Sequence, residues 1–444
     1  MEAGNSDKAT HLCILTHGMW GKPLHLQHLK ETLSKQYPSG ELYVFAPNSN
    51  AEYLTYDGIE TGAERVTHEV EAKIAELTAA GAKLEKISIA GYSLGGLVAR
   101  YVVGLLHKNG VFDTLEPTNF TTFATPHLGT RAHGTGYGGT FWNNLGAKTL
   151  SASGAQMFLA DSFRNTGKPL LSTLADPNSI FIQGLKRFKR KSVYANTLND
   201  RSVPYYTACI TRVDPFVDLD AVDLHYLEGQ APDEEVILDP ETPVTAKKTP
   251  QTALTLYQRS SRSLTNVPFY ALLTVLLPIG ATFFLVNSGI QSFRSAARMK
   301  LHEEGKAGIT THKYRMPLLE DARGMQDRVY EQLNNNQQEE YLPTPPPEPV
   351  SSSSSASSSS TQLPSEKNLA RQQSKKNHSP WPTLALNDHQ FAMIDGLDSV
   401  GLIKYPCHID QVRHTHAAIV VRSERSSYPQ GRAVVKHWAS NFIL

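Results

Sequence analysis

The chain contains 444 residues, which is enough for a sizeable hydrophobic core and for more than one domain. Its 43 lysines and arginines balance 42 aspartates and glutamates, and the formal net charge of +1 gives no sign of a nucleic-acid partner. Only three cysteines are present and they lie far apart, which excludes a disulfide framework and a cysteine-based metal site. Residues 1–10 contain no apolar stretch, so we expect no signal peptide.

Short apolar runs alternate with longer amphipathic segments through residues 8–212. Runs rich in β-branched and aromatic residues predict strands at 11–16, 41–48, 86–91, 119–125 and 191–197. Helical periodicity predicts helices between them, at 24–37, 58–80 and 94–110. This alternation is typical of the α/β class, in which helices cover both faces of a mostly parallel central sheet.

A nucleophile motif lies at the end of the third predicted strand. The residues from Gly91 to Gly95 read Gly-Tyr-Ser-Leu-Gly, between a predicted strand and a predicted helix, which is the context that the G-x-S-x-G motif requires. At such a turn the hydroxyl of Ser93 projects from the sheet, and the two glycines remove Cβ atoms that would clash. Ser93 is the predicted nucleophile, and the amide of Leu94 is the expected first oxyanion donor. A glycine-rich turn that merely contains serine is the alternative.

The loop after the first predicted strand offers a second oxyanion donor. His17 and Gly18 match the His-Gly arrangement used at this position in enzymes with a nucleophile elbow, which makes the amide of Met19 the predicted donor. We expect His17 to orient the loop without taking part in proton transfer. A plain turn after a strand is the alternative interpretation.

After the alternating region the composition changes several times. Residues 213–262 are a polar connection, and residues 263–293 are an uncharged, mostly apolar segment. Residues 294–340 form a basic and polar connection, and residues 341–380 are rich first in proline and then in serine, which predicts a disordered linker. Apolar periodicity returns in residues 381–444. The sequence therefore predicts a core in two parts with a long insertion between them.

Several stretches together resemble the DUF676 family of serine esterases, which are α/β-hydrolases related to lipases. They read LTHGMWG, TYDGIETGAERV, GYSLGGLVARY, TFATPHLGT and ANTLNDRSVPY. With the apolar segment, the serine-rich tract and HTHAAIVVR near the end, the chain is similar to the fungal lipid-droplet phospholipases of that family. The resemblance covers about residues 10–212 and 382–444, and it implies an α/β-hydrolase fold and a glycerophospholipid substrate.

The acid and the base of a triad follow the serine on this fold, in the order Ser, Asp or Glu, His. Asp200 comes just after a predicted strand, where it can orient a histidine, and the family's N-D-x-x-V pattern implies that role. Asp176 and Asp214 are alternatives that follow no clear strand, and a turn-forming Asn-Asp pair is another interpretation. The family's pattern of a histidine, two small or polar residues and an apolar run implies that His416 is the base. His414 is the alternative base.

The apolar segment decides whether these residues can meet. Residues 266–286 carry no charge and are long enough to span a bilayer. The predicted nucleophile and acid precede this segment, whereas His416 follows it. A single crossing would separate them by about 30 Å of hydrocarbon, whereas proton transfer needs about 3 Å. We therefore expect residues 263–293 to form a hairpin, bent near Pro278 and Gly280, that inserts into one leaflet. A buried lid or pair of core helices is the alternative.

These observations predict a lipid carboxylic-ester hydrolase, namely a phospholipase that releases fatty acid from glycerophospholipids. We expect a monotopic protein on a lipid droplet or on the cytosolic face of a membrane such as the endoplasmic reticulum. Its partners are then the lipid substrate and a lipid surface, with no nucleic acid, and a serine triad needs neither a metal nor an organic cofactor. The alternatives are a triacylglycerol or monoacylglycerol lipase, an acyl thioesterase, and a catalytically inactive membrane scaffold.

Overall fold

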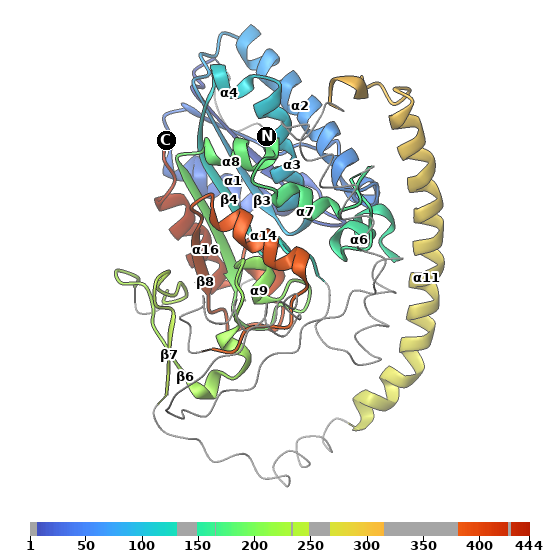
Figure 1. Cartoon of the computed structure of the whole chain (residues 1–444). Helices are drawn as coiled ribbons and strands as arrows, with labels where there is room; N and C mark the ends of the chain where they lie inside the picture. Colours follow the sequence, from blue (N-terminus) through green and yellow to red (C-terminus); the bar gives the residue numbers. More distant parts are fainter. Residues whose placement is uncertain are drawn as a thin grey trace, which may run out of the picture.

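A computed structural model describes most of the predicted core and part of the insertion (Figure 1). The described residues are 7–130, 149–164, 166–231, 234–247, 267–314, 381–424 and 428–444, without the side chains of 267–284. The predicted disordered linker, residues 341–380, lies outside this part of the chain.

Six parallel strands form the central sheet, in the order β2-β1-β3-β4-β5-β8. They are β1 (His11–Thr16), β2 (Leu42–Phe45), β3 (Lys86–Tyr92), β4 (Glu116–Phe123), β5 (Arg190–Asn196) and β8 (Ile403–Cys407). The chain moves from β1 to β2 on one side and then to β3 on the other, so the winding direction reverses between β1 and β3. Loops at the carboxyl ends of such neighbours form the usual ligand crevice. The predicted parallel α/β sheet is confirmed.

Both faces of the sheet are buried, as expected where helices cover a parallel sheet. In β1, Leu12 and Ile14 belong to one hydrophobic cluster, and Cys13 and Leu15 belong to the other. The helices that cover the first face are α2 (Ile59–Ala79), α3 (Leu94–Lys108), α7 (Leu170–Ala175), α8 (Ile180–Lys186) and α14 (Asp388–Asp398). Helices α1 (Gln27–Gln36), α15 (Thr415–Ala418) and α16 (Pro429–Ser440) cover the second face.

Short elements complete the described fold. They are η1 (Pro23–Leu26), η2 (Glu52–Tyr56), α4 (Val111–Thr114), α6 (Ser151–Met157), α9 (Tyr205–Ala208), η3 (Pro215–Val217), η4 (Leu219–Ala221), η5 (Thr311–Lys313) and the two-stranded pair β6 (Val222–Leu224) and β7 (Val244–Ala246).

The connection after residue 212 contributes to the core as well as linking elements. Val236, Ile237 and Leu238 are fully buried. The amide of Leu238 donates to the carbonyl of Pro406 at 2.9 Å. The amide of His408, directly after β8, donates to the carbonyl of Val236 at 2.8 Å. This short run therefore lies antiparallel along the outer edge of β8. Three apolar residues in a polar stretch are too few for a periodicity signal, which is why the sequence predicted only a polar connection.

The hairpin expected over residues 263–293 is not what the structure shows. Helix α11 (Val267–Glu303) continues through Pro278 and Gly280 without reversing, and it runs along one side of the molecule (Figure 1). A proline inside a helix removes one backbone hydrogen bond and adds a steric kink, whereas a reversal needs a loop of several residues. The leucines and alanines around Pro278 favour continued helix. Among the helices described, none is long and apolar enough to cross a membrane.

The second half of α11 docks on the core through its polar side. The imidazole Nε2 of His302 lies 2.6 Å from a carboxylate oxygen of Glu64, and both side chains are fully buried. The guanidinium of Arg298 binds the buried carboxylate of Asp57 at 2.6 Å. Ser288 donates a hydrogen bond to a backbone carbonyl before α6. The groups that hold α11 in place are therefore ionic and polar.

The contact between α14 and α7 predicts the effect of one glycine substitution. A Cβ at Gly396 would lie 1.9 Å from the carbonyl oxygen of Ala175, whereas a Cβ at Gly289 in α11 meets nothing within 4 Å. We expect Gly396→Ala to lower the free energy of unfolding by about 1–3 kcal/mol through overpacking. Gly289→Ala is the matched control and should raise it by up to about 1 kcal/mol through helix propensity. Urea denaturation measures both, and equal stability of the two variants would contradict the described packing.

Candidate active site

The turn between β3 and α3 holds Ser93 in a strained conformation. Its φ of 54° and ψ of −131° lie outside the regions that L residues favour. The flanking glycines permit this turn because the backbone approaches them closely. A Cβ at Gly95 would lie 2.3 Å from the carbonyl oxygen of Thr16, and one at Gly91 would lie 2.5 Å from the Cα of Gly96. The local sequence therefore allows the tight strand-to-helix turn that presents the Ser93 hydroxyl.

The structure brings Ser93, Asp200 and His416 together. The Nε2 atom of His416 lies 3.0 Å from the hydroxyl oxygen of Ser93, and its Nδ1 atom lies 2.9 Å from Oδ2 of Asp200. The three side chains come from the ends of β3, β5 and β8, which are separated by more than a hundred residues along the chain. With the proton on Nδ1 donated to Asp200, Nε2 is free to accept the hydroxyl proton of Ser93.

The backbone around β5 orients the carboxylate of Asp200. Its Oδ1 accepts hydrogen bonds from the amides of Ser202 at 3.0 Å and Val203 at 2.8 Å. Its Oδ2 accepts from the side-chain amide of Asn196 at 2.8 Å as well as from the imidazole. The Asp200 side chain is only 2% exposed. Four donors therefore leave the carboxylate little rotational freedom, and the imidazole tautomer is determined with it.

Two contacts that the sequence did not point to support the loop of His416. The hydroxyl of Tyr92 donates to the carbonyl of His416 at 2.9 Å, and their rings lie 5.2 Å apart. The hydroxyl of Thr415 donates to the carbonyl of Leu198 at 2.8 Å, which joins the loops of the base and the acid. An aromatic residue directly before the nucleophile was the available signal for Tyr92. No local sequence pattern identifies Thr415 as a supporting residue.

The alternative acids and the alternative base lie apart from this arrangement. Asp176 and Asp214 each accept a hydrogen bond from the backbone amide two residues further on, which is a turn-capping role. Burial raises the pKa of Asp214. His414 is exposed and lines a neighbouring cleft. The structure therefore brings neither alternative acid nor His414 into the hydrogen-bonded relay.

The loop after β1 approaches the serine from the adjacent strand. A Cβ at Gly18 would lie 2.7 Å from the Cβ of Ser93, so only glycine permits this approach. Within the described residues, no hydrogen bond uses the backbone amides of Met19 or Leu94. The buried ring of His17 contacts the carbonyl of Gly18 at 3.2 Å, and burial lowers its pKa. A neutral His17 fits an orienting role, and the two unused amides remain candidates for the oxyanion.

The loop that carries Met19 is connected to helix α11. The amide of Trp20 donates to the hydroxyl of Thr55 at 3.1 Å, and the amide of Glu52 donates to a loop carbonyl at 2.7 Å. Both partners belong to η2, and Asp57, directly after η2, binds Arg298 of α11. A short chain of contacts therefore joins α11 to one of the candidate oxyanion donors.

Part of the chain matches a known family. Residues 6–211 match the family model described as "Putative serine esterase (DUF676)". This range includes the nucleophile elbow, the His-Gly loop and Asp200, but it ends before β8 and His416. The family match therefore does not include His416, and its place in the site rests on the geometry of the structure.

Curated fungal proteins are similar to part of the chain. "Putative lipase C4A8.10" of Schizosaccharomyces pombe is 28% identical over 212 residues, which are 46% of this chain and 26% of that protein. "Putative lipase ROG1" of Saccharomyces cerevisiae is 29% identical over 245 residues, which are 53% of this chain and 33% of that protein. The chain thus spans about a third or less of the length of these relatives.

A solved structure is also similar in part. Carboxyl esterase 2 of the mycorrhizal fungus Tuber melanosporum is 15% identical, with a TM-score of 0.29, over 44% of this chain and 60% of its own. The α/β-hydrolase fold of the present chain rests on its strand order and on the turn at Ser93.

The substitution Asp200→Asn tests the hydrogen-bonded relay of Ser93, His416 and Asp200. Asp200→Asn removes the acceptor that holds the proton on Nδ1 of His416, and the wrong tautomer cannot take the proton of Ser93. We expect kcat for a soluble nitrophenyl ester to fall by about 10³–10⁴-fold. Asp176→Asn is the matched control and should leave kcat unchanged within about twofold. If both variants kept wild-type kcat, the relay would not operate, and circular dichroism would verify that each variant is folded.

Proposed function

We propose that the whole chain belongs to the DUF676 family of serine esterases, whose model residues 6–211 match, and that it hydrolyses carboxylic esters of lipids. The observation that carries the proposal is the hydrogen-bonded relay: the hydroxyl of Ser93 lies 3.0 Å from the imidazole of His416, which in turn lies 2.9 Å from Asp200. A scaffold without activity has no need of a strained serine, an oriented imidazole and two unused amides at one place. The geometry therefore favours an enzyme over the scaffold alternative.

The proposed reaction is acyl transfer to serine followed by hydrolysis. His416 accepts the proton of Ser93 as its oxygen attacks the acyl carbonyl, and Asp200 stabilises the imidazolium. The amides of Met19 and Leu94 donate to the oxyanion. His416 then gives the proton to the leaving alcohol as the ester bond breaks. Water, deprotonated by His416, attacks the acyl-enzyme, and the returned proton regenerates the hydroxyl of Ser93 as fatty acid leaves.

Helix α11 supports the proposal that the substrate is at a lipid surface. Of the ten large hydrophobic residues exposed in the described chain, five belong to this helix. They are Leu285, Val286, Ile290, Phe293 and Leu301, with exposed fractions from 46% to 80%. The spacing of three and four residues between Val286, Ile290 and Phe293 puts them on one side of the helix. The opposite side, with Ser295 and His302, is fully buried.

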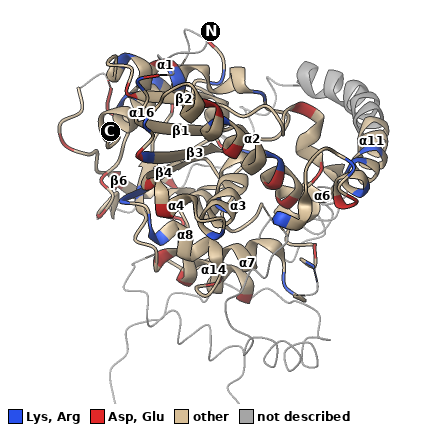
Figure 2. Ribbon diagram, turned by 90° about the horizontal axis from the view of Figure 1, so that it is seen from above, with Lys and Arg blue, Asp and Glu red and all other residues tan. Residues whose placement is uncertain are grey.

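This arrangement reverses the usual amphipathic helix, whose apolar side packs on the core and whose polar side faces water. The apolar residues of α11 face outward, and they continue the uncharged segment of residues 266–286. In Figure 2, α11 stands at the periphery of the molecule, away from the central sheet. Arg294 and Lys300 are exposed on the same helix and can meet anionic headgroups. We therefore assign this side of α11 to one leaflet of a lipid surface.

The location that fits is a lipid droplet or the cytosolic face of a membrane such as the endoplasmic reticulum. Ser93 and His416 lie on either side of the apolar segment in sequence, so the segment must enter and leave the lipid on one side for the relay to form. Glycerophospholipids, which form such surfaces, are the proposed substrate class. A surface-bound enzyme meets them without drawing an acyl chain through water.

Ser93→Ala tests the enzymatic proposal. The variant lacks the attacking oxygen, so we expect release of fatty acid from phospholipid vesicles to fall by at least about 10³-fold. Mass spectrometry of mixed emulsions should show lysophospholipid with the wild type only. Partial glycerides without lysophospholipid would assign the enzyme to neutral lipids, and products that are the same with both proteins would refute the serine mechanism.

Phe293→Asp tests the lipid-facing side of α11. Phe293 is 80% exposed, so the change should leave the fold intact while placing a charge in the proposed contact. We expect recovery with floated vesicles that contain anionic phospholipid to fall severalfold, because burying a charge in lipid is costly. Val217, 81% exposed in η3, provides the matched control Val217→Asp, which should float like the wild type. Equal loss in both variants, or in neither, would contradict the assignment to α11.

A further inference from the structure

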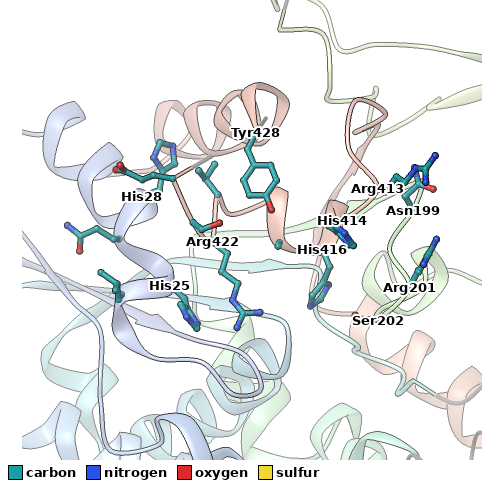
Figure 3. A pocket seen from close by; sticks show the side chains of 16 residues that line it. His25, His28, Asn199, Arg201, Ser202, Arg413, His414, His416, Arg422 and Tyr428 are labelled. Atoms are coloured by element: carbon teal, nitrogen blue, oxygen red, sulfur yellow. The ribbon is translucent and has the colours of Figure 1, made fainter. Parts of the chain in front are cut away.

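A cleft opens beside the candidate base. Its volume is about 810 Å³, and four loops distant in sequence form its walls (Figure 3). They are the junction of η1 with α1, the loop after β5, the loop that enters α15 and the loop that leaves it. The charged and titratable residues described in its lining are Arg201, Arg413, Arg422, His25, His28, His414, His416, Glu424 and Tyr428. A chain of net charge +1 thus gathers three arginines and one acid around a single cleft.

No carboxylate in the described part of the chain neutralises these arginines. Several other arginines form ion pairs, namely Arg65 and Arg298 with Asp57, Arg164 with Glu60, Arg187 with Asp113, and Arg212 with Asp395. Arg201, Arg413 and Arg422 have no such partner within the described residues. The guanidinium of Arg422 hydrogen-bonds the hydroxyl of Tyr92. The remaining N–H donors of the three planar guanidinium groups are of the kind that suits phosphate oxygens.

The neighbourhood of Arg422 is positive and incompletely hydrogen-bonded. The guanidinium of this half-buried side chain extends between His25 and His416 (Figure 3). Burial, followed by the positive charge of Arg422, lowers the pKa of His25 to about 4, so this imidazole is neutral near pH 7. The Nδ1 atom of His25 is buried and has no hydrogen-bond partner within the described chain.

The reaction itself determines which part of an ester lies on this side of Ser93. In acyl transfer the imidazole returns its proton to the leaving oxygen, so the alcohol portion of the substrate must lie against His416. In a glycerophospholipid that portion is the glycerol with its phosphate, only a few bonds from the oxygen that leaves. The cleft that contains Arg422 adjoins His416, so it lies where this phosphate has to go.

We propose that Arg201, Arg413 and Arg422 form a subsite for the phosphate of a glycerophospholipid and select phosphate-bearing lipids over neutral glycerides. This inference rests on the proposed ester hydrolysis and assigns its substrate class to named residues. Arg422 holds the phosphate beside the leaving oxygen, and the exposed side chains of Arg201 and Arg413 close the site from its rim. A neutral diacylglycerol places no anion here and gains nothing from the three cations.

Kinetics on two lipids with the same acyl chains test the selection. Dioleoyl phosphatidic acid and dioleoylglycerol are presented in the same detergent micelles, and kcat/KM is measured for each. The selectivity is the kcat/KM for dioleoyl phosphatidic acid divided by that for dioleoylglycerol. Changing Arg201, Arg413 and Arg422 together to Gln should lower this ratio by at least about tenfold, because charged hydrogen bonds are lost for the phosphate-bearing substrate only. Arg413→Gln alone, at an exposed position, should lower it in the same direction but less. Arg187→Gln, a surface control, should leave the ratio unchanged.

A binding measurement separates this inference from the proposed activity. Calorimetry on Ser93→Ala should show saturable binding of soluble dibutyryl phosphatidic acid that weakens at least about tenfold with the three arginine changes. Inorganic phosphate should bind much more weakly than this lipid, and equal binding would reassign the cleft to a free phosphate and overturn the lipid subsite. Unchanged binding and an unchanged kinetic ratio would overturn the subsite alone. Arginine-dependent binding without any wild-type hydrolysis would overturn the activity and leave the subsite standing.

Discussion

The pairing of β8 with β5 is the constraint on which the site depends. These strands run in register from Ser192 opposite Ile403 to Asn196 opposite Cys407, although about two hundred residues separate them. The pairing adds the last strand to the sheet and delivers the loop of His416 beside that of Asp200. Because loop-closure entropy grows only slowly with loop length, a long insertion between the two strands still allows the relay to form, provided that both ends of the insertion stay on one side of any lipid.

Helix α11 connects its outward-facing apolar residues to the end of the sheet that carries Ser93. Its inner side is held by two contacts with buried carboxylates, namely His302 with Glu64 and Arg298 with Asp57. Asp57 also pairs with Arg65 of α2. Through η2 the same contacts reach the loop of Met19. The outward apolar residues of α11 therefore have a defined orientation relative to the core.

Local patterns predicted the parts of the fold that local forces determine. The predicted strands coincide with β1 to β5, because burial on both faces requires apolar β-branched and aromatic residues in sequence. The sequence analysis missed, or predicted wrongly, the elements whose formation depends on distant partners. The run at Val236 pairs with the edge of the sheet only because β8 lies beside it. The hydrogen bond of Tyr92 likewise depends on the distant carbonyl of His416. The expected hairpin at Pro278 is a continuous helix, since a proline kinks a helix without reversing the chain.

The sequence by itself determined the candidate nucleophile, the glycines that permit its turn and the order in which acid and base follow, because each is written in a few adjacent residues. It did not decide between His414 and His416 as the base, because only the family resemblance, and no local pattern, favoured His416. Only the tertiary structure decided that His416 meets Asp200 and Ser93, that three arginines share one cleft, and that α11 buries its polar side. These outcomes depend on contacts between segments far apart in the chain, which no local pattern encodes.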